Sequence, residues 1–504
     1  MQKTKRFTKK EWSWIMYDWA NSIYATNIMA AIYPTIFASM FDKGDIMWGY
    51  GTSIATFIVA VLAPFLGAIA DHKGMKKTLF TVFALAGIVF TPLMAFFGSM
   101  KLCLIGYVLS RIGFSGSCLF YDSFLTDVTT NERMDKVSSW GYAMGYIGGS
   151  TIPFVISIAI LLICGFGSRF AQVFSVLIVS AWWVVFSVPF WKNVKQEHYI
   201  ENAEAFSPKK IVLNVWKTFK DICTHKGLLI FIIAYFFYID GVGTIISIST
   251  AYGTTLGLGS TGMIIALLVT QIVAMPCSIL FAKISGKAGA RKSLIGAIAI
   301  YILICIVGFI MGYTLEPDQK AYETMVDNAA APYIEVMADN EKETASLFVN
   351  EAKTALKAEN AEAEMAALLE KETYISDSVK TLSDALLTAA NENKSVIDNF
   401  NSAVSFSSLL FWSMACLVGT VQGGIQAVSR SYFGKLVPKD RSNEYFGFFD
   451  IFGKFAAVIG PLLYSTVAAF TGRSSYGVLG LMALFFIGLI MLVVGKKDLD
   501  ALTE

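Results

Sequence analysis

The sequence predicts an all-α integral membrane protein with twelve transmembrane helices in two pseudo-symmetric six-helix bundles and an extra helical extracytoplasmic insert. Three observations predict this class. First, 55% of the 504 residues are hydrophobic and 15% are charged, whereas about a quarter of the residues of a soluble domain are charged. Second, the apolar residues gather in runs that are long enough to cross a bilayer. Third, the charged residues are distributed unevenly between those runs.

Twelve apolar runs have the length that a bilayer-spanning helix needs, which is about 20 residues. Each is expected to form one transmembrane helix. In chain order they cover residues 13–40, 47–70, 78–98, 102–125, 138–163, 169–190, 228–250, 260–283, 293–314, 405–429, 446–470 and 476–495.

These runs divide the chain into five parts. We expect an N-terminal six-helix bundle over 1–190, a cytoplasmic linker over 191–227, the first part of a C-terminal bundle over 228–314, an extracytoplasmic acidic insert over 315–404 and the second part of that bundle over 405–504. The linker is basic and is typical of an amphipathic connector at a membrane surface. In the insert, one face of a predicted helix is apolar, which is formed by Ile375, Val379, Leu382 and Leu386.

The two halves of the chain also resemble each other. Asp18 followed by Ser22 in the first run is echoed by Asp240 followed by Thr244 in the seventh. The sequence ADHKG after the second run is echoed by AKISG after the eighth, and basic pairs follow both. Similar residues that occur in the same order at corresponding positions of the two halves favour a duplicated six-helix unit.

The charges predict the orientation in the membrane. Outside the insert, the predicted inner segments hold 27 Lys and Arg residues and the short outer loops hold 4. Cytoplasmic loops retain positive charge, so we expect both termini in the cytoplasm of a multi-pass protein of the cell (plasma) membrane. The stretch from Glu316 to Asp398 holds 18 acids and 7 bases, a net charge of −11, and lies outside in this topology.

The loop after the second run reads GAIADHKGMKK and predicts a gate at the cytoplasmic face. A glycine at its start lets two helices approach closely, and a second glycine permits a tight turn that returns two lysines towards the membrane. The alternative is a plain basic loop. The motif resembles the signature loop between spans 2 and 3 of the major facilitator superfamily, and RIGFSG around Arg111 is similar to its span 4 arginine motif. The gate residues that we expect are Gly67, Asp71, Gly74, Lys76, Lys77, Asp127 and Arg133.

A narrower resemblance covers most of the chain outside the insert. The stretches at 17–22, 141–149, 234–247, 421–433 and 444–461 resemble the vacuole-effluxer-like branch of that superfamily, which is associated with autophagy in fungi and with amino-acid release from vacuoles. The resemblance implies a two-lobed transporter that works by alternating access, and it points to amino acids or related small solutes. Acidic and basic groups in the same cavity would suit a zwitterion, and we expect a secondary active transporter that is an exporter or proton-coupled. The chain departs from the family's pattern by its long insert and by Lys283, which stands where the first half has Asp71.

Ionisable residues inside transmembrane runs are costly and are functional candidates by default. Asp240 is the strongest candidate for the substrate or coupling site, because it lies near the middle of its run. Asp18 is shallower and could instead belong to a gate. Transporters of this kind hold their substrate near the bilayer midplane. The other candidates are Asn21, Ser22, Arg111, Asp122, Thr244, Gln422, Gln426, Asp450 and Lys454.

Some of these residues have structural alternatives. Asp450 and Lys454 are four residues apart, the spacing of an intrahelical ion pair. Gln422 and Gln426 could join neighbouring helices rather than contact a substrate. The three histidines fall in predicted cytoplasmic loops, so carboxylates would carry any transported proton.

The sequence contains no motif of a hydrolase, a metalloprotease or an ATP-driven pump. The seven cysteines are scattered singly, which indicates neither a disulfide framework nor a metal site. We therefore expect a non-enzyme without cofactor or metal, whose partners are a small-molecule solute, the lipid bilayer and protons, with no nucleic acid, and which is a monomer. The competing hypothesis is a transport-inactive receptor or scaffold that acts through the insert. A passive channel would not need duplicated halves.

Overall fold

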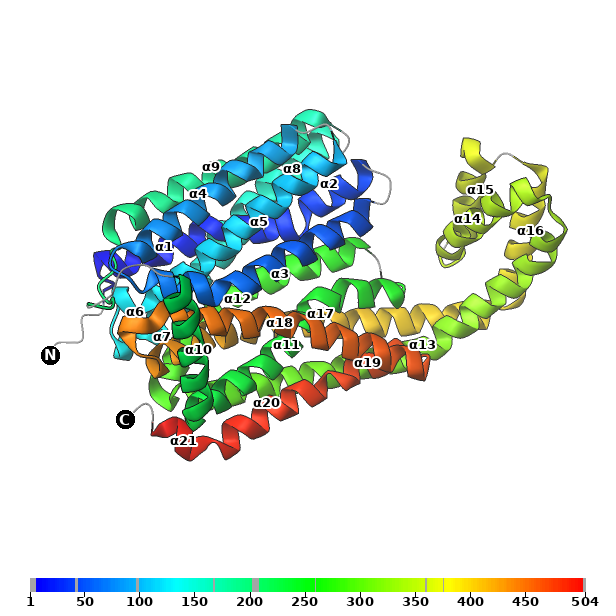
Figure 1. Cartoon of the computed structure of the whole chain (residues 1–504). Coiled ribbons are helices and arrows are strands. Elements are labelled where there is room, and N and C mark those ends of the chain that lie inside the picture. Colours follow the sequence, from blue (N-terminus) through cyan, green and yellow to red (C-terminus); the bar gives the residue numbers. More distant parts are fainter. Residues whose placement is uncertain are drawn as a thin grey trace.

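The chain is described here by a computed structural model, which covers residues 6–40, 44–96, 99–165, 168–201, 208–258, 260–358, 360–374 and 376–501. These residues form two helical lobes that lie side by side, with a small helical insert at one end (Figure 1). The part of the chain that the structure describes contains helices and no strand. The all-α class is confirmed.

The first lobe contains the elements up to α9. Two of them, η1 and η2, are π-helical segments. Their bounds are α1 Lys9–Ile23, η1 Tyr24–Ala30, α2 Ile32–Met40, α3 Gly44–Ala70, α4 Met75–Phe96, α5 Met100–Ser123, α6 Leu125–Val128, α7 Asn131–Met144, η2 Gly145–Thr151, α8 Ile152–Cys164 and α9 Arg169–Asn193.

The remaining elements form the linker, the second lobe and the insert. Their bounds are α10 Pro208–Thr224, α11 Lys226–Thr255, α12 Ser260–Ala288, α13 Ala290–Val336, α14 Asp339–Ala355, α15 Ala361–Leu369, η3 Glu372–Tyr374, α16 Asp377–Glu392, α17 Lys394–Leu436, η4 Lys439–Arg441, α18 Ser442–Thr471, α19 Ser474–Gly480, α20 Met482–Val494 and α21 Lys496–Asp500.

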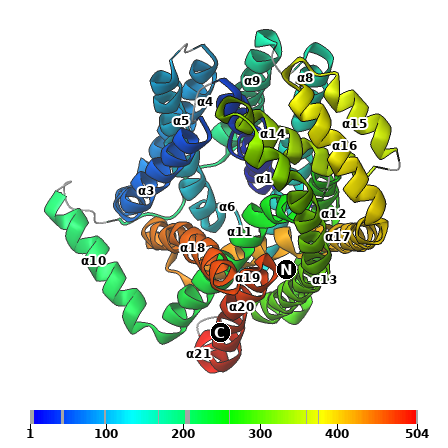
Figure 2. The same ribbon diagram turned by 90° about the vertical axis from the view of Figure 1, so that its right-hand side faces the viewer.

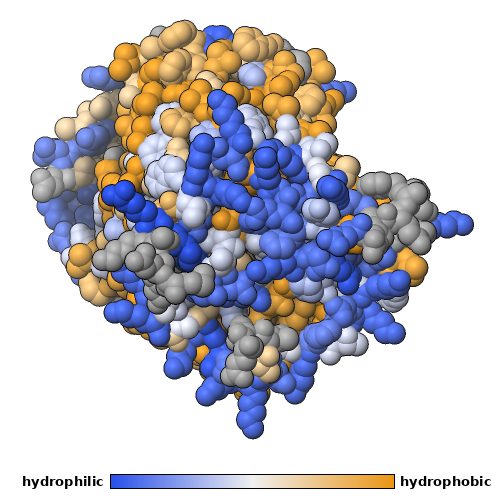
Figure 3. Space-filling view, turned by 90° about the vertical axis from the view of Figure 1, so that its left-hand side faces the viewer, coloured by the Kyte–Doolittle hydropathy of each residue, from blue (hydrophilic) through white to orange (hydrophobic). Residues whose placement is uncertain are grey.

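Both chain termini lie at one end of the two lobes, and the insert projects from the other end (Figure 1). We call these ends the terminal face and the insert face. Hydrophilic side chains gather over the terminal face, and hydrophobic ones cover the flank of the molecule beside it (Figure 3). This division is typical of a helical bundle whose sides contact lipid and whose ends contact water.

Eleven helical segments of the described chain are long and apolar enough to cross a membrane. They overlap eleven of the twelve predicted spans. The first predicted span, 13–40, is not among them, and in the structure it is divided into α1, η1 and α2. The fifth predicted span is also interrupted, since η2 separates α7 from α8.

The π-helical segment η2 packs closely on α1. A side chain at Gly148 would overlap the ring of Trp19, and one at Gly149 would overlap Ser22. The glycines of η2 therefore let the backbone of α1 approach, which a larger residue would prevent. A π-helical turn realigns the helix around such a contact.

Two helices continue well beyond the membrane-spanning length and carry the insert. α13 has 47 residues and α17 has 43, so the predicted insert limits of 315 and 404 fall inside continuous helices. Tyr322 and Phe400 stack at 4.9 Å between ring centroids, which joins the two extensions. In α16, Val379, Leu382 and Leu386 are buried and confirm the predicted apolar face; Ile375 lies outside the described residues.

The linker helix α10 crosses the ends of the bundle rather than running along it. It lies at the terminal face, roughly perpendicular to the long helices, and extends to the periphery of the molecule (Figures 1 and 2). Its exposed apolar side chains include Val212 and Trp216, whereas Thr218 is buried. The predicted amphipathic connector is thus a helix with an uncovered apolar face.

Candidate functional site

One arginine of the second lobe enters the first lobe and pairs with two carboxylates there. Arg430 of α17 is 3% exposed. Its Nη1 donates to Asp122 Oδ1 of α5 at 2.8 Å, and its Nη2 lies 3.4 Å from Asp18 Oδ2 of α1. It also donates to the hydroxyl and the carbonyl oxygen of Ser138 in α7. A buried guanidinium needs this many partners to offset the loss of its hydration.

Aromatic rings enclose the same guanidinium group. The Arg430 carbon Cζ lies 4.7 Å from the ring centroid of Trp14 and 4.6 Å from that of Tyr142. Tyr121 donates its hydroxyl to Asp18 Oδ2 at 2.7 Å. The rings attract the cation through their π faces and exclude water, which strengthens the ion pairs.

A cavity of about 270 Å³ lies between the lobes beside this cluster. Four predicted site residues line it: Asp122, Gln426, Asp450 and Lys454. On α18, Lys454 and Asp450 form the ion pair that their spacing predicts, so that prediction is confirmed. The rest of the wall includes Arg430 and is largely aromatic, with Tyr142, Tyr235, Phe446 and Phe449. The cavity therefore offers both signs of charge and apolar surface to one small solute.

Asp240 does not line this cavity. It is 1% exposed and, with Thr244, lies in α11 against Gly460 of α18. The neighbouring residue Ile239 lines the cavity, and one step along a helix turns the side chain about 100° away. Both carboxylate oxygens of Asp240 and the hydroxyl of Thr244 are buried without a hydrogen-bond partner among the described residues.

The other predicted substrate or coupling residues are dispersed. Asn21 donates to Cys118 at 3.5 Å, and Ser22 donates to the backbone of Asp18 at 2.8 Å. Gln422 lines a separate, mainly apolar cavity of about 90 Å³ between α11, α12 and α17. In Arg111, the Nε and Nη1 atoms are buried with no partner within the described part of the chain.

The predicted gate residue Asp71 caps a helix of the opposite lobe. Its Oδ1 accepts from the backbone and side-chain nitrogens of Asn443 at 3.0 and 2.6 Å, and its Oδ2 accepts from the backbone nitrogen of Glu444 at 3.0 Å. These N–H groups belong to the first turn of α18, which has no acceptor within its own helix. Burial raises the pKa of Asp71 to about 7, and Lys76 and Asn443 offset this only in part.

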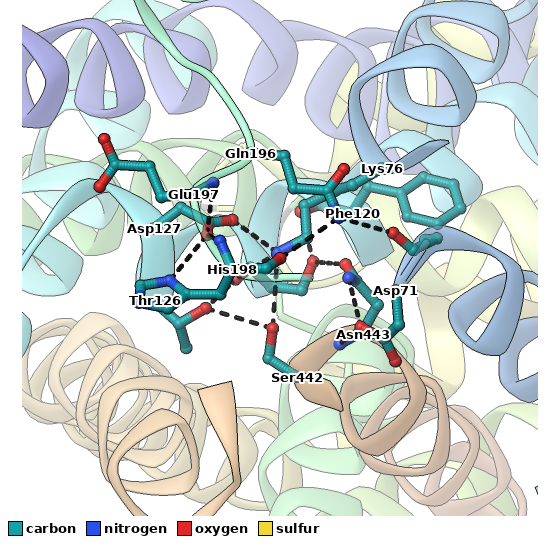
Figure 4. A network of polar contacts seen from close by, with 12 residues as sticks. Asp71, Lys76, Phe120, Thr126, Asp127, Gln196, Glu197, His198, Ser442 and Asn443 are labelled. Carbon is teal, nitrogen blue, oxygen red and sulfur yellow. Dashed lines mark hydrogen bonds and ion pairs between the residues drawn. The ribbon is translucent and has the colours of Figure 1, made fainter. Parts of the chain in front are cut away.

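Lys76 and Asp127 form a fully buried ion pair beside this cap. Their charged groups are 2.6 Å apart and both side chains are 0% exposed. The Asp127 Oδ1 atom also accepts from the backbone nitrogens of Glu197 and His198, at 3.0 and 2.9 Å, and lies 3.0 Å from His198 Nδ1 (Figure 4). Lys76 reaches the opposite lobe through Ser442, whose Oγ is 3.4 Å from its Nζ.

The remaining gate residues support this arrangement. A Cβ at Gly67 would overlap the backbone carbonyl of Asn443, so only glycine permits this approach of α3 and α18. Gly74 has φ of +78° in the turn before α4. Lys77 donates to the carbonyl oxygens of Trp191 and Val194.

Arg133 lies farther from the cap and joins a different part of the first lobe. It pairs with Glu11 at 2.7 Å. This pair links the start of α7 to the start of α1.

Several residues of the inter-lobe contact cannot be identified from the sequence. Asp135 of α7 accepts from Lys435 and Ser431 of α17, at 2.5 and 2.7 Å, and from Ser285 of α12, at 2.6 Å. It stands in the polar stretch NERMDK, which gives no signal that it is buried. The sequence does indicate Arg430, which follows Gln422 and Gln426 at four-residue intervals on one helical face, although it is not among the expected site residues.

The contacts that Asp71, Lys76 and Asp135 make between the lobes lie on the terminal side of the cavity. Along α18, Asn443 precedes the cavity residue Asp450 by seven residues, which corresponds to about 10 Å of helix. Lys435 lies beyond Arg430 towards the end of α17. These polar contacts therefore join the lobes between the cavity and the terminal face, while packing of η2 on α12 also joins them.

Two helical lobes, eleven membrane-length helical segments in the described residues and a charged cavity between the lobes define a two-lobed, multi-pass membrane protein. Solved structures share the fold. A bacterial homologue of the iron transporter ferroportin in an outward-facing state has a TM-score of 0.58 and 11% identity, over 97% of this chain and 98% of that one. The fucose:proton symporter FucP of E. coli has a TM-score of 0.58 and 11% identity, over 97% of each chain.

The family model described as "Vacuole effluxer Atg22 like" matches residues 46–134, 126–323 and 407–498. The chain is 38% identical to the uncharacterized MFS-type transporter YxiO of Bacillus subtilis (strain 168), over 98% of this chain and 96% of that protein. It is 30% identical to autophagy-related protein 22 of Vanderwaltozyma polyspora over 91 residues, which are 17% of this chain and 18% of that protein. The chain belongs to the vacuole effluxer Atg22-like family and is an MFS-type transporter.

Proposed function

We propose that this chain is a secondary active transporter of amino acids or related zwitterionic solutes and that it works by alternating access. The observation that carries the proposal is the inter-lobe cavity, where Asp122 and Asp450 face the same space as Arg430 and Lys454. A zwitterion carries one charge of each sign and would exchange its hydration for contacts with both. The aromatic wall would receive an apolar side chain.

In this proposal, Asp122, Gln426, Asp450 and Lys454 contact the solute, and Arg430 alternates between solute and carboxylates. Asp18, Asn21, Ser22 and Gln422 position the cavity helices, since each contacts or neighbours one of them. The Nε and Nη1 groups of Arg111 have no hydrogen-bond partner among the described residues, and in this proposal they bind an anionic group during the transport cycle.

The gate of the proposed transporter is the set of contacts at the terminal face. The cap from Asp71 to α18 and the pairs around Lys76 and Asp135 would have to break before the cavity could open to that side. Gly67, Gly74, Lys77, Asp127 and Arg133 hold the partners in place. Because each contact is short and buried, closure and opening would be two discrete states rather than a gradual motion.

Protons are the proposed coupling ion, and Asp240 is the proposed carrier. An ionised carboxylate that is buried without a partner is very unfavourable, so the neutral, protonated form fits this conformation. A metal cation would need several oxygen ligands, and among the described residues Thr244 is the one neighbouring side chain in α11 that is also buried without a hydrogen-bond partner. Asp240→Asn should keep solute exchange within about twofold but lose accumulation driven by a pH gradient, whereas Asp240→Glu should retain both.

We propose that the protein lies in the cell membrane as a monomer with its terminal face in the cytoplasm. Positive charge supports this orientation, and the cavity is built from one chain. The proposed parts are the bundle over 1–190, the linker over 191–227, the C-terminal bundle over 228–314 and 405–504, and the external insert over 315–404.

Counterflow in proteoliposomes tests the function. The vesicles are loaded with an excess of mixed unlabelled amino acids, and labelled amino acids are added outside, with and without a pH gradient. We expect label to accumulate above the level in protein-free vesicles. No accumulation of any amino acid by folded protein would contradict the substrate class and would favour the alternative, a scaffold that acts through the insert.

A further inference from the structure

A basic groove opens at the terminal face beside the gate and is separate from the inter-lobe cavity. It encloses about 540 Å³ between the start of α4 and the segment that follows α9. Three lysines line it, Lys73, Lys77 and Lys195, together with polar groups such as Gln196 and Tyr199. The described lining includes no acidic residue.

No carboxylate of the described residues neutralises the positive charges of this groove. Lys73 and Lys195 are exposed, and neither pairs with a carboxylate of the described chain. Lys195 is near enough to Lys77 to repel it. Lys77 is held at 2.7 and 2.8 Å by two backbone carbonyl groups, which leaves one of its three N–H groups for a ligand. Lys73 lies over the Tyr199 ring at 5.5 Å.

The groove continues into the lipid-facing surface of α4. Thr81 and Val82 line its deeper part, and they belong to the membrane-length segment that begins at Met75. Val82, Leu85 and Val89 are 56%, 45% and 52% exposed, and their spacing of three and four residues places them on one face. A polar end thus meets an apolar stripe at the level where headgroups meet acyl chains.

We propose that this groove binds an anionic phospholipid, with the phosphate at the three lysines and one acyl chain along the α4 stripe. Three N–H donors from lysines suit a phosphate as point charges, and juxtamembrane basic residues attract anionic lipid. A soluble phosphate would use the lysines but not the stripe.

The bound lipid would stabilise closure of the terminal face. The segment that lines the groove also covers the gate, because Gln196 donates to the carbonyl oxygen of Ala70 at 3.0 Å and the backbone of Glu197 and His198 holds Asp127. A phosphate that bridges α4 to this segment would therefore fix the partners of the Lys76–Asp127 pair.

The test measures thermal unfolding of the full chain in detergent as phosphatidylglycerol or phosphatidylcholine is added. We expect phosphatidylglycerol to raise the unfolding midpoint and phosphatidylcholine to have little effect. Lys73→Gln with Lys195→Gln should raise the amount of phosphatidylglycerol needed for half of the effect by about 30-fold, since each lysine contributes several-fold in affinity. The matched control is Lys283→Gln with Lys287→Gln, which removes two exposed lysines from the last turns of α12 in the second lobe.

The control pair should leave the phosphatidylglycerol response unchanged. An equal loss in both double variants would mean attraction to the whole basic surface and would overturn the proposed site. If soluble glycerol phosphate raised the unfolding midpoint as much as phosphatidylglycerol does, the proposal that the groove binds a lipid would be overturned. Native mass spectrometry supplies a second readout, in which the wild-type chain should retain phosphatidylglycerol and the Lys73/Lys195 variant should release it.

Discussion

Arg430 shows how a single side chain connects helices of both lobes. It belongs to α17, yet its charge is neutralised by Asp122 of α5 and Asp18 of α1. Removing one member of a buried ion pair leaves the other members unpaired, which costs about 3–5 kcal/mol. Arg430→Gln should therefore lower the thermal unfolding midpoint in detergent and reduce counterflow at least tenfold.

A surface pair provides the control for Arg430. Lys371 pairs with Glu351 at 2.6 Å in the insert, where the two side chains are 55% and 45% exposed. Exposed pairs contribute about 0–1 kcal/mol, so Lys371→Gln should have little effect on either measurement. Similar losses in the two variants would show that the position of the pair does not matter and would contradict the role given to Arg430.

Asp71 predicts how pH acts on the gate. Its pKa is raised from 3.8 to about 7 where α18 covers it, and opening would expose it and restore the ordinary value. The covered state therefore binds the proton more tightly, so acidification from pH 8 to pH 6 should favour closure of the terminal face. This stabilisation of the closed state is fully present below the ordinary pKa of Asp71 and is lost as the pH rises through 7.

Spin labels on opposite lobes measure this equilibrium. Cysteines at Glu132 and Asp440, both exposed at the terminal face, would carry the labels in a variant without the native cysteines. We expect the short-distance population to grow on acidification, with a midpoint near pH 7. Asp71→Asn should abolish the dependence, because its side chain does not titrate. A pH dependence that persists in this variant would exclude Asp71 as its source.

At the scale of the element, the contact of η2 with α1 predicts the effect of one methyl group. Gly148→Ala would place a Cβ in the ring of Trp19, and overpacking of this kind costs about 1–3 kcal/mol. The unfolding midpoint should fall. Gly243→Ala in α11 is the matched control, because nothing lies within 4 Å of its Cβ position. An equal decrease in both variants would mean that backbone freedom, and not this contact, determines the result.

Most helices could be predicted from the sequence because hydropathy and length are local properties. The limits of α13 and α17 could not. The apolar run stops near residue 314, but most of the residues that follow favour helix, and α13 continues even through Pro317 and Pro332. The π-helical segments η1 and η2 were also missed, since they depend on how α1 meets its neighbours rather than on composition.

The site was predicted less completely than the helices. Asp122, Asp450 and Lys454 were found because charge inside an apolar run is costly wherever it faces. Whether such a residue faces the other lobe depends on the rotation of its helix, which no local pattern records. For this reason Asp240 was expected with the solute but lies behind the cavity wall, and Asp135 was missed.

At the scale of the molecule, two helices of the described chain reach both the insert and the transport unit and join them. α13 and α17 pack together from the membrane region to the stacked pair of Tyr322 and Phe400. A variant that lacks residues 327–395 and joins the helices by about four Gly/Ser residues, a span of roughly 13 Å, would keep that pair. Because the cavity residues and the gate lie elsewhere, counterflow should remain within about twofold of the full chain.

The same variant separates the two hypotheses about function. A transporter with an accessory cap would lose the insert without losing solute exchange, whereas a scaffold that acts through the insert would lose its activity. Circular dichroism and the unfolding midpoint verify that the shortened chain is folded. The opposite control is Asp122→Asn in the full chain, which keeps the insert intact and alters the cavity. We expect exchange to survive the deletion and to fail in Asp122→Asn; the reverse pattern would place the function in the insert.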